Sequence, residues 1–143
     1  MLPGLLALTV AAVFSGAAIY VLAVEHVARA ALDDRAALTE WKPSYKRGAV
    51  MQASIALVGT ALGALAWWQT ANMWFAAGAI LMLLPWPWTL LVIKLTNDAL
   101  LATPLDAAGP QTRALLKAWG NYHAVRMALG CAAAVAFLIA LTR

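Results

Sequence analysis

Apolar residues are gathered along this chain into four long stretches, and shorter connections carry most of the charge. The apolar stretches cover residues 2–24, 50–68, 73–93 and 124–141. A helix that spans a bilayer needs about 20 apolar residues, because each residue adds about 1.5 Å across a core of about 30 Å. The pattern therefore predicts an all-α protein, a four-helix transmembrane bundle that forms a single domain over residues 1–143.

The connection between the first two stretches is polar but has a helical pattern. Residues 31–41, ALDDRAALTEW, place their apolar side chains at helical spacing. We expect a short interfacial helix here that ends at Pro43, with Ser44 capping the second span. Further along, Pro110 favours the start of a helix that runs unbroken into the fourth span.

The third stretch contains the motif LPWPWTLL, with prolines at positions 85 and 87. Proline cannot donate a backbone hydrogen bond, and its ring collides with the preceding turn. This helix should be kinked or locally opened, with neighbouring helices sheltering the freed carbonyls. Two interpretations stay open, a structural kink and a ligand cavity beside the kink, where Trp86 would contact the ligand.

Composition supports a membrane protein, since 64% of the residues are hydrophobic and only 11% are charged. Soluble domains average about 25% charged residues. The net charge is +4, but no basic run with interleaved aromatics indicates a nucleic-acid partner. The first stretch is too long for a signal peptide and lacks a basic segment before it.

The basic residues predict the orientation of the bundle. Nine of the ten lysines and arginines lie within residues 25–47 and 94–126, and the tenth is Arg143. Cytoplasmic loops carry an excess of lysine and arginine. We therefore expect both longer connections in the cytoplasm and both termini outside it, in a bacterial inner membrane. On this interpretation Arg29 and its basic neighbours are topology signals, and Glu40 belongs to a solvated face.

Alternating spans bring four helix ends to one level, and the unusual polar residues lie at those ends. On the fourth helix, residues 119, 123, 126 and 130 form a single stripe, and Gly130 would let a partner backbone approach. Ionisable groups at membrane depth are functional candidates by default. The predicted polar layer consists of Glu25, His26, Tyr45, Arg47, Gln52, Lys94, Asn97, Trp119, His123 and Arg126.

Three roles fit this layer. A histidine can act as general base on a phenol or an activated C–H group, while Arg126 or Asn97 stabilises the oxyanion. Alternatively, two histidines and a carboxylate can form a facial triad for iron. Adjacent helical residues such as Glu25 and His26 diverge by about 100°, which disfavours a shared ion. The third role is a polar lock without chemistry, for example a Glu25–Arg126 ion pair.

Four motifs carry a family resemblance: FSGAAIYVLAVEHVAR, WKPSYKRGAVMQAS, WPWTLLVIKLTNDALL and WGNYHAVRMALG. Together they resemble the anthrone-oxygenase-like integral membrane family, from about Phe14 to Gly130. The chain departs from the family pattern at Val27, where relatives carry proline, and at Lys94-Leu95, where they carry Met-Pro. An extra lysine at the mouth of the site would change its substrate preference or charge balance.

The resemblance implies a compact four-span membrane protein. Some fungal relatives oxidise an anthrone to an anthraquinone with O₂ and are described as needing no added cofactor. Carried over by position, the resemblance makes site candidates of Glu25, His26, Tyr45, Arg47, Gln52, Asn97, Trp119, His123 and Arg126.

We therefore expect an oxygenase-like protein that acts on a lipophilic anthrone-type or quinol-type substrate and requires no cofactor. His123 or His26 would accept a proton, Arg126 and Asn97 would hold the oxyanion, and Glu25 would orient a histidine or Arg126. Substrate contacts are expected from Tyr45, Arg47, Gln52, Trp119, Trp86 and Lys94.

Two alternatives remain at this point. Iron, copper or haem could be bound by His26 and His123, or the chain could be a non-enzymatic partner subunit. The expected partners are membrane lipid and a lipophilic small molecule entering from the bilayer, and the sequence is compatible with a homo-oligomer.

Overall fold

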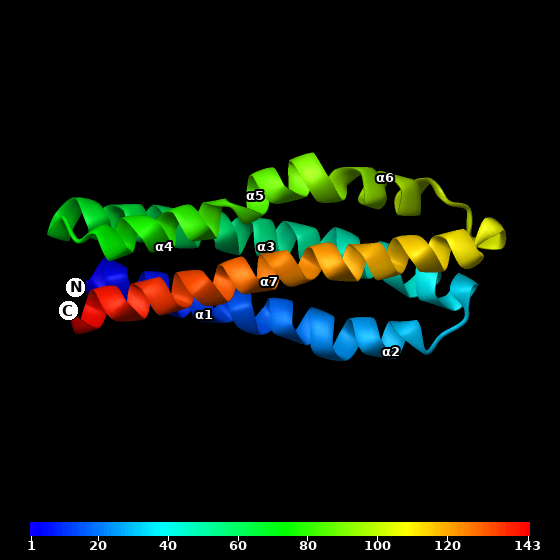
Figure 1. Ribbon diagram of the computed structural model, residues 1–143, viewed down its shortest axis with the longest axis horizontal. Coiled ribbons are helices and arrows are strands. Elements are labelled where there is room, and N and C mark those ends of the chain that lie inside the picture. The colour runs from blue at the N-terminus through cyan, green and yellow to red at the C-terminus, as the bar shows by residue number, and fades with distance from the viewer.

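The computed structural model describes residues 1–143 and is built from helices without any β-strand. Four long helical segments run antiparallel, so that both chain termini lie at the same end of the bundle (Figure 1). Their elements are, in chain order, α1 (Leu2–Tyr20), η1 (Val21–Glu25), α2 (His26–Ala30), α3 (Asp34–Thr70), α4 (Met73–Leu83), α5 (Pro85–Trp88), η2 (Thr89–Ile93), α6 (Lys94–Ala102), η3 (Leu105–Ala107) and α7 (Pro110–Thr142).

All four segments are long and apolar enough to cross a membrane, which confirms the predicted four-helix bundle. Each predicted span falls inside one of them. At the end of the bundle opposite the termini, all four segments extend beyond the predicted spans, to residues 30, 34, 102 and 110. The expected start of the last helix at Pro110, and its unbroken run into the fourth span, are confirmed.

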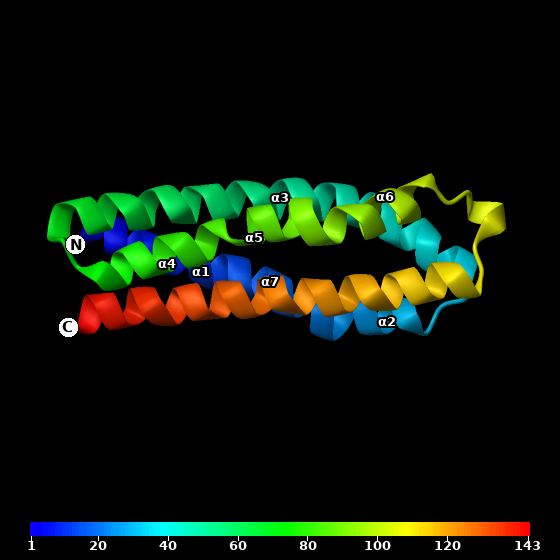
Figure 2. The ribbon, with the colours of Figure 1, turned by 45° about the horizontal axis from the view of Figure 1, so that its top comes forward.

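The predicted separate interfacial helix is wrong, because its residues form the first turns of α3. Asp33 caps α3 by accepting a hydrogen bond from the Ala36 backbone N–H at 2.8 Å, and Pro43 lies inside the helix. Tertiary contacts hold the chain just before the proline. Trp41 is fully buried, and Lys42 Nζ donates hydrogen bonds to the carbonyls of Leu101 and Thr103, at the end of α6. Figure 2 shows these first turns inclined to the rest of α3.

The third segment is broken as its prolines predict. Helix α4 ends at Leu83, α5 restarts at Pro85, and a π-helical turn, η2, follows. The break is visible between α4 and α5 in Figure 1. Two tryptophans anchor the segment to its neighbours, since Trp86 Nε1 donates to the Ala53 carbonyl at 3.3 Å and Trp88 Nε1 to the Tyr122 carbonyl at 3.1 Å.

Two apolar clusters hold the helices together, one toward each end of the bundle. The cluster near the termini is built from small residues around Phe14, Met82 and Phe137. The cluster at the opposite end contains Trp41 and Trp119. Gly130, which we expected to admit a partner backbone, instead faces the ring of Phe14. The polar layer overlaps the second cluster, which includes Trp119 and contacts Tyr45.

Candidate functional site

A cavity of about 430 Å³ opens among the four helical segments at the level of the polar layer. A volume of this size suits a small organic ligand. Eight of the predicted site residues line it, contributed by all four segments: Glu25, Tyr45, Arg47, Gln52, Asn97, Trp119, His123 and Arg126. The structure therefore brings together most of the residues that the sequence placed at one level, and we call this cavity the central pocket.

The deep wall of the central pocket is polar and incompletely hydrogen-bonded. Gln52, Asn97, His123 and Arg126 expose only 2–9% of their surfaces. Each has a buried polar atom without a partner in the protein: Gln52 Oε1, Asn97 Oδ1, His123 Nε2 and Arg126 Nε. Arg126 takes part in none of the four ion pairs of the structure. Buried polar groups are costly unless paired. Arg126 Nε can donate to an electron-rich ligand atom, whereas Gln52 Oε1 and Asn97 Oδ1 can accept from a ligand donor, so this wall is suited to a polar ligand group.

A row of aromatic rings forms another wall. The Trp119 and His123 rings stack at 5.1 Å between centroids, and Trp119 meets Trp41 edge to face at 6.0 Å. Trp41 in turn stacks on Tyr45 at 4.7 Å. Aromatic pairs in these arrangements favour one orientation of each ring. The row therefore holds the imidazole of His123 and the phenol of Tyr45 in place at the pocket.

His26 is not part of the central pocket, contrary to the expectation that both histidines share one site. It packs against Trp119 at 5.9 Å and lines a separate cavity of about 240 Å³ with Arg29, Arg113 and Lys117. Its ring fits against the bare backbone of α7 at Gly120, where a Cβ atom would overlap it. Trp119 contacts both histidine rings, and only His123 reaches the central pocket.

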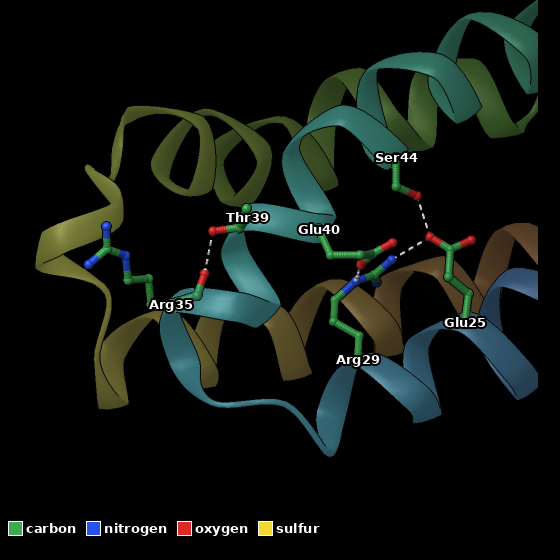
Figure 3. Close-up of polar contacts among 6 residues, drawn as sticks. All are labelled: Glu25, Arg29, Arg35, Thr39, Glu40 and Ser44. Atoms are coloured by element: carbon green, nitrogen blue, oxygen red, sulfur yellow. Dashed lines mark hydrogen bonds and ion pairs between the residues drawn. The ribbon is translucent and has the colours of Figure 1, made fainter.

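Glu25 lines the central pocket but is engaged by other residues. Its carboxylate accepts hydrogen bonds from Ser44 Oγ and from Arg29 Nη2, and Arg29 Nε donates to Glu40, as Figure 3 shows. The expected roles for Glu25, orienting a histidine or pairing with Arg126, are therefore not seen. We call these four residues the polar clasp, because they join the end of the first helical segment to α3.

The other members of the polar clasp also differ from expectation. The sequence predicts Arg29 to be a topology signal, yet its side chain is only 2% exposed and lies 5.7 Å from the centroid of the Trp119 ring. Glu40 was assigned to a solvated face, yet it pairs with Arg29. The spacing of four residues between Glu25 and Arg29 is the one sequence signal that indicates this pairing.

Two predicted substrate contacts lie outside the central pocket. Lys94 is exposed and pairs with Asp98 one helical turn later, because both project from the outer face of α6. Trp86 lines a smaller cavity of about 100 Å³ beside Pro85 and Thr89. This small cavity shares Ala49 and Arg126 with the central pocket, so the kink and the site are neighbours.

The metal hypothesis required two histidines and a carboxylate at one point. The structure contains no group of three or more histidine, cysteine, aspartate or glutamate residues that could hold a metal ion. Glu25 is occupied by the polar clasp, and His26 and His123 line different cavities. The predicted donors therefore do not form the facial triad.

A comparison with known protein families identifies the family of this chain. The sequence model of the anthrone oxygenase family matches residues 41–136, which is about two thirds of the chain. The chain belongs to the anthrone oxygenase family. Family membership and the four apolar helices together make it an oxygenase-like integral membrane protein. No curated protein and no solved structure matches the chain.

The matched segment of the anthrone oxygenase family contains seven of the eight predicted residues in the central pocket, all except Glu25. Glu25 and His26 precede it. The pocket also includes residues that sequence reasoning missed, among them Ser44, Gly48 and Ile93. These carry no chemical signature in the sequence, and only the packing of α3 against its neighbours places them there.

Proposed function

We propose that this anthrone oxygenase family member oxidises a lipophilic anthrone-type or quinol-type substrate with O₂ in the central pocket, with no cofactor required. The observation that carries the proposal is Arg126, a buried guanidinium without a carboxylate partner, beside His123 and Asn97. A buried cation of this kind favours a ligand that develops negative charge on oxygen. Family membership supports an anthrone as that ligand.

The chemistry begins with a proton transfer. An anthrone has a CH₂ group whose loss of a proton places negative charge on the ring carbonyl oxygen. His123 accepts this proton as general base. Arg126 and the amide N–H of Asn97 donate hydrogen bonds to the oxyanion, which lowers the cost of forming it in an apolar site.

The electron-rich carbon then reacts with O₂. A C–O bond forms to give a peroxide anion, which takes back the proton from His123 to become a hydroperoxide. Loss of the remaining C–H proton, with cleavage of the O–O bond, releases water and leaves a carbonyl group. The sum is CH₂ plus O₂ giving C=O plus H₂O, with the substrate oxidised and O₂ reduced.

The aromatic row gives the substrate a place to bind. A flat tricyclic ligand can lie against Trp119 and Tyr45 while its oxygen points toward Arg126. The predicted orientation, with both termini outside the cytoplasm of a bacterium, would place the central pocket near the cytoplasmic face.

The proposal is tested by adding anthrone to the purified protein and following O₂ uptake and anthraquinone absorbance. Replacing His123 by glutamine should reduce the rate by about 10²–10⁴-fold, the usual contribution of a general base. His26→Gln is the matched control, because this histidine lines another cavity, and it should retain the wild-type rate. A wild-type rate equal to that of His123→Gln would refute the proposal.

The alternative is a metal or haem bound through His26 and His123, which the structure does not favour because the two histidines line different cavities. Elemental analysis and an absorption spectrum of the same preparation distinguish the two. Activity that disappears with a chelator and returns with iron or copper would favour the alternative.

A further inference from the structure

The exposed lining of the central pocket shows on which side it opens. Residues contributed by η2, α6 and α7 are buried, with Ile93 and Asn97 at 2% exposure. By contrast, Tyr20 is 59% exposed and Met51 46%, and both line the pocket from the first segment and from α3. The mouth of the pocket therefore lies between α1 and α3, on the side away from the kinked third segment.

We expect this mouth to face the bilayer, because it lies on helices long and apolar enough to span a membrane. Residues close in sequence to its lining are apolar and exposed, including Ile19 at 45%, Val24 at 50% and Val50 at 70%. Arg47, an exposed residue, also lines the pocket, one residue before Gly48 and nearer the polar end of α3. Long cationic side chains near the ends of spanning helices reach toward headgroups. The mouth thus combines an apolar edge with a single cation at its polar side.

The polar clasp closes the approach to the central pocket from the aqueous loop side. Ser44 on α3 reaches across to Glu25, and Arg29 links Glu25 to Glu40, so the two segments are joined on the side of the α2–α3 connection (Figure 3). Along α1 and α3, Tyr20 and Met51 lie farther from this connection than Glu25 and Ser44 do. Entry from the aqueous loop side would require breaking these ion pairs, whereas entry from the lipid side would not.

Gly48 keeps the mouth open. It lines the central pocket, and a Cβ atom added to it would meet nothing within 4 Å. A larger side chain would therefore extend into the opening without colliding with a neighbouring helix. Gly16 offers a matched control, since it is also a helical glycine with no atom within 4 Å of an added Cβ, but it does not line the pocket.

We propose that ligands enter the central pocket laterally from the bilayer through the opening bounded by Tyr20, Gly48 and Met51, and that the absence of a side chain at Gly48 sets the width of this entrance. Arg47 at the polar side favours lipophilic molecules that carry an electron-rich oxygen atom. The choice of anthraquinone and anthrone as probes rests on the proposed function, but the position of the entrance does not.

The experiment measures association of anthraquinone, which cannot turn over, with protein in lipid nanodiscs, for wild type and for Gly48→Ala, Gly48→Leu and Gly16→Leu. Leucine at position 48 has to move aside before each entry, so association should slow by about tenfold or more, with alanine intermediate. Gly16→Leu should match the wild type. Replacing glycine inside a helix raises helix propensity, so circular dichroism and melting should show all variants folded.

The possible outcomes distinguish a failure of the proposed entrance from a failure of the proposed function. Slow association in Gly48→Leu alone supports the entrance, even if anthrone gives no O₂ uptake and the proposed function fails. Equal association rates in Gly48→Leu and wild type overturn the entrance, whether or not anthrone is oxidised.

Discussion

Arg29 and Arg126 are both buried arginines in helices that are long and apolar enough to span a membrane, yet their surroundings are opposite. Arg29 is held by Glu25 and Glu40, and its carboxylate partner Glu25 is bound in addition by Ser44. Arg126 has no carboxylate partner, and its neighbours in the central pocket also have unsatisfied polar atoms. Arg29 Nη1 has no partner either, so the difference between the two arginines is that Arg29 has two carboxylate partners and Arg126 has none. A cation held by carboxylates stabilises the fold, whereas a buried cation without one is available to a ligand.

The largest expected effect is on stability, in the polar clasp. Arg29→Gln leaves two carboxylates without their cation. Breaking a fully buried pair from one side costs about 3–5 kcal/mol, and water can reach the Glu25 and Glu40 side chains, which are 22% and 39% exposed, so we expect a loss at or below the lower end of that range. Thermal unfolding in detergent should show this loss, and the triple change Arg29→Gln, Glu25→Gln and Glu40→Gln should recover part of it. An Arg29→Gln protein that melts with the wild type would mean that the polar clasp has no structural role.

The next effect is on activity, in the central pocket. Arg126→Gln removes an oxyanion donor, so anthrone oxidation should fall by about 10²–10³-fold. Stability should not fall with it, because no ion pair is lost and a buried cation is removed. Parallel measurement of O₂ uptake and unfolding tests this separation. A loss of stability as large as that of Arg29→Gln would contradict the contrast between the two arginines.

A smaller effect tests whether His26 belongs with the structural region. Gly120→Ala places a methyl group where the His26 ring lies, and such overpacking costs about 1–3 kcal/mol. The double variant Gly120→Ala and His26→Ala should regain stability, while Gly16→Ala, in open space, serves as the control. Non-additive unfolding free energies in this cycle are the expected readout. Simple additivity would show that the contact is energetically unimportant.

The smallest effect is expected at Lys94, which lies outside the central pocket. Its ion pair with Asp98 is exposed, and such pairs contribute about 0.5 kcal/mol or less. Lys94→Gln should therefore leave both the unfolding midpoint and the KM for anthrone unchanged. A clear rise in KM would return Lys94 to the substrate contacts.

Much of the fold follows from local patterns. The four apolar stretches, the breaking of the third helix by Pro85 and Pro87, and the start of the last helix at Pro110 are all readable from residue type and spacing. Pro43 is the counterexample, since a proline that predicts a helix end is retained inside α3. Burial of Trp41 and the bonds of Lys42 to distant carbonyls outweigh the local preference.

The sequence predicts the depth of the candidate site in the bundle, but not which residues line it. Antiparallel helices of similar length bring helix ends together, so residues such as Asn97 and His123 were expected to meet. Helical rotation and the order of packing could not be obtained from spacing. As a result, His26 and His123 each contact the Trp119 ring but line different cavities, and Glu25 pairs with Arg29.

By itself, the sequence determined that this protein is a four-helix membrane bundle of the anthrone oxygenase type, with its polar residues concentrated at one level. Apolar length and helical period are properties of single segments, which is why they can be read without a structure. Only the tertiary structure decided which polar groups satisfy one another in the polar clasp and which remain unpaired around the central pocket. That division depends on distances between different helices, and no local pattern in the chain records them.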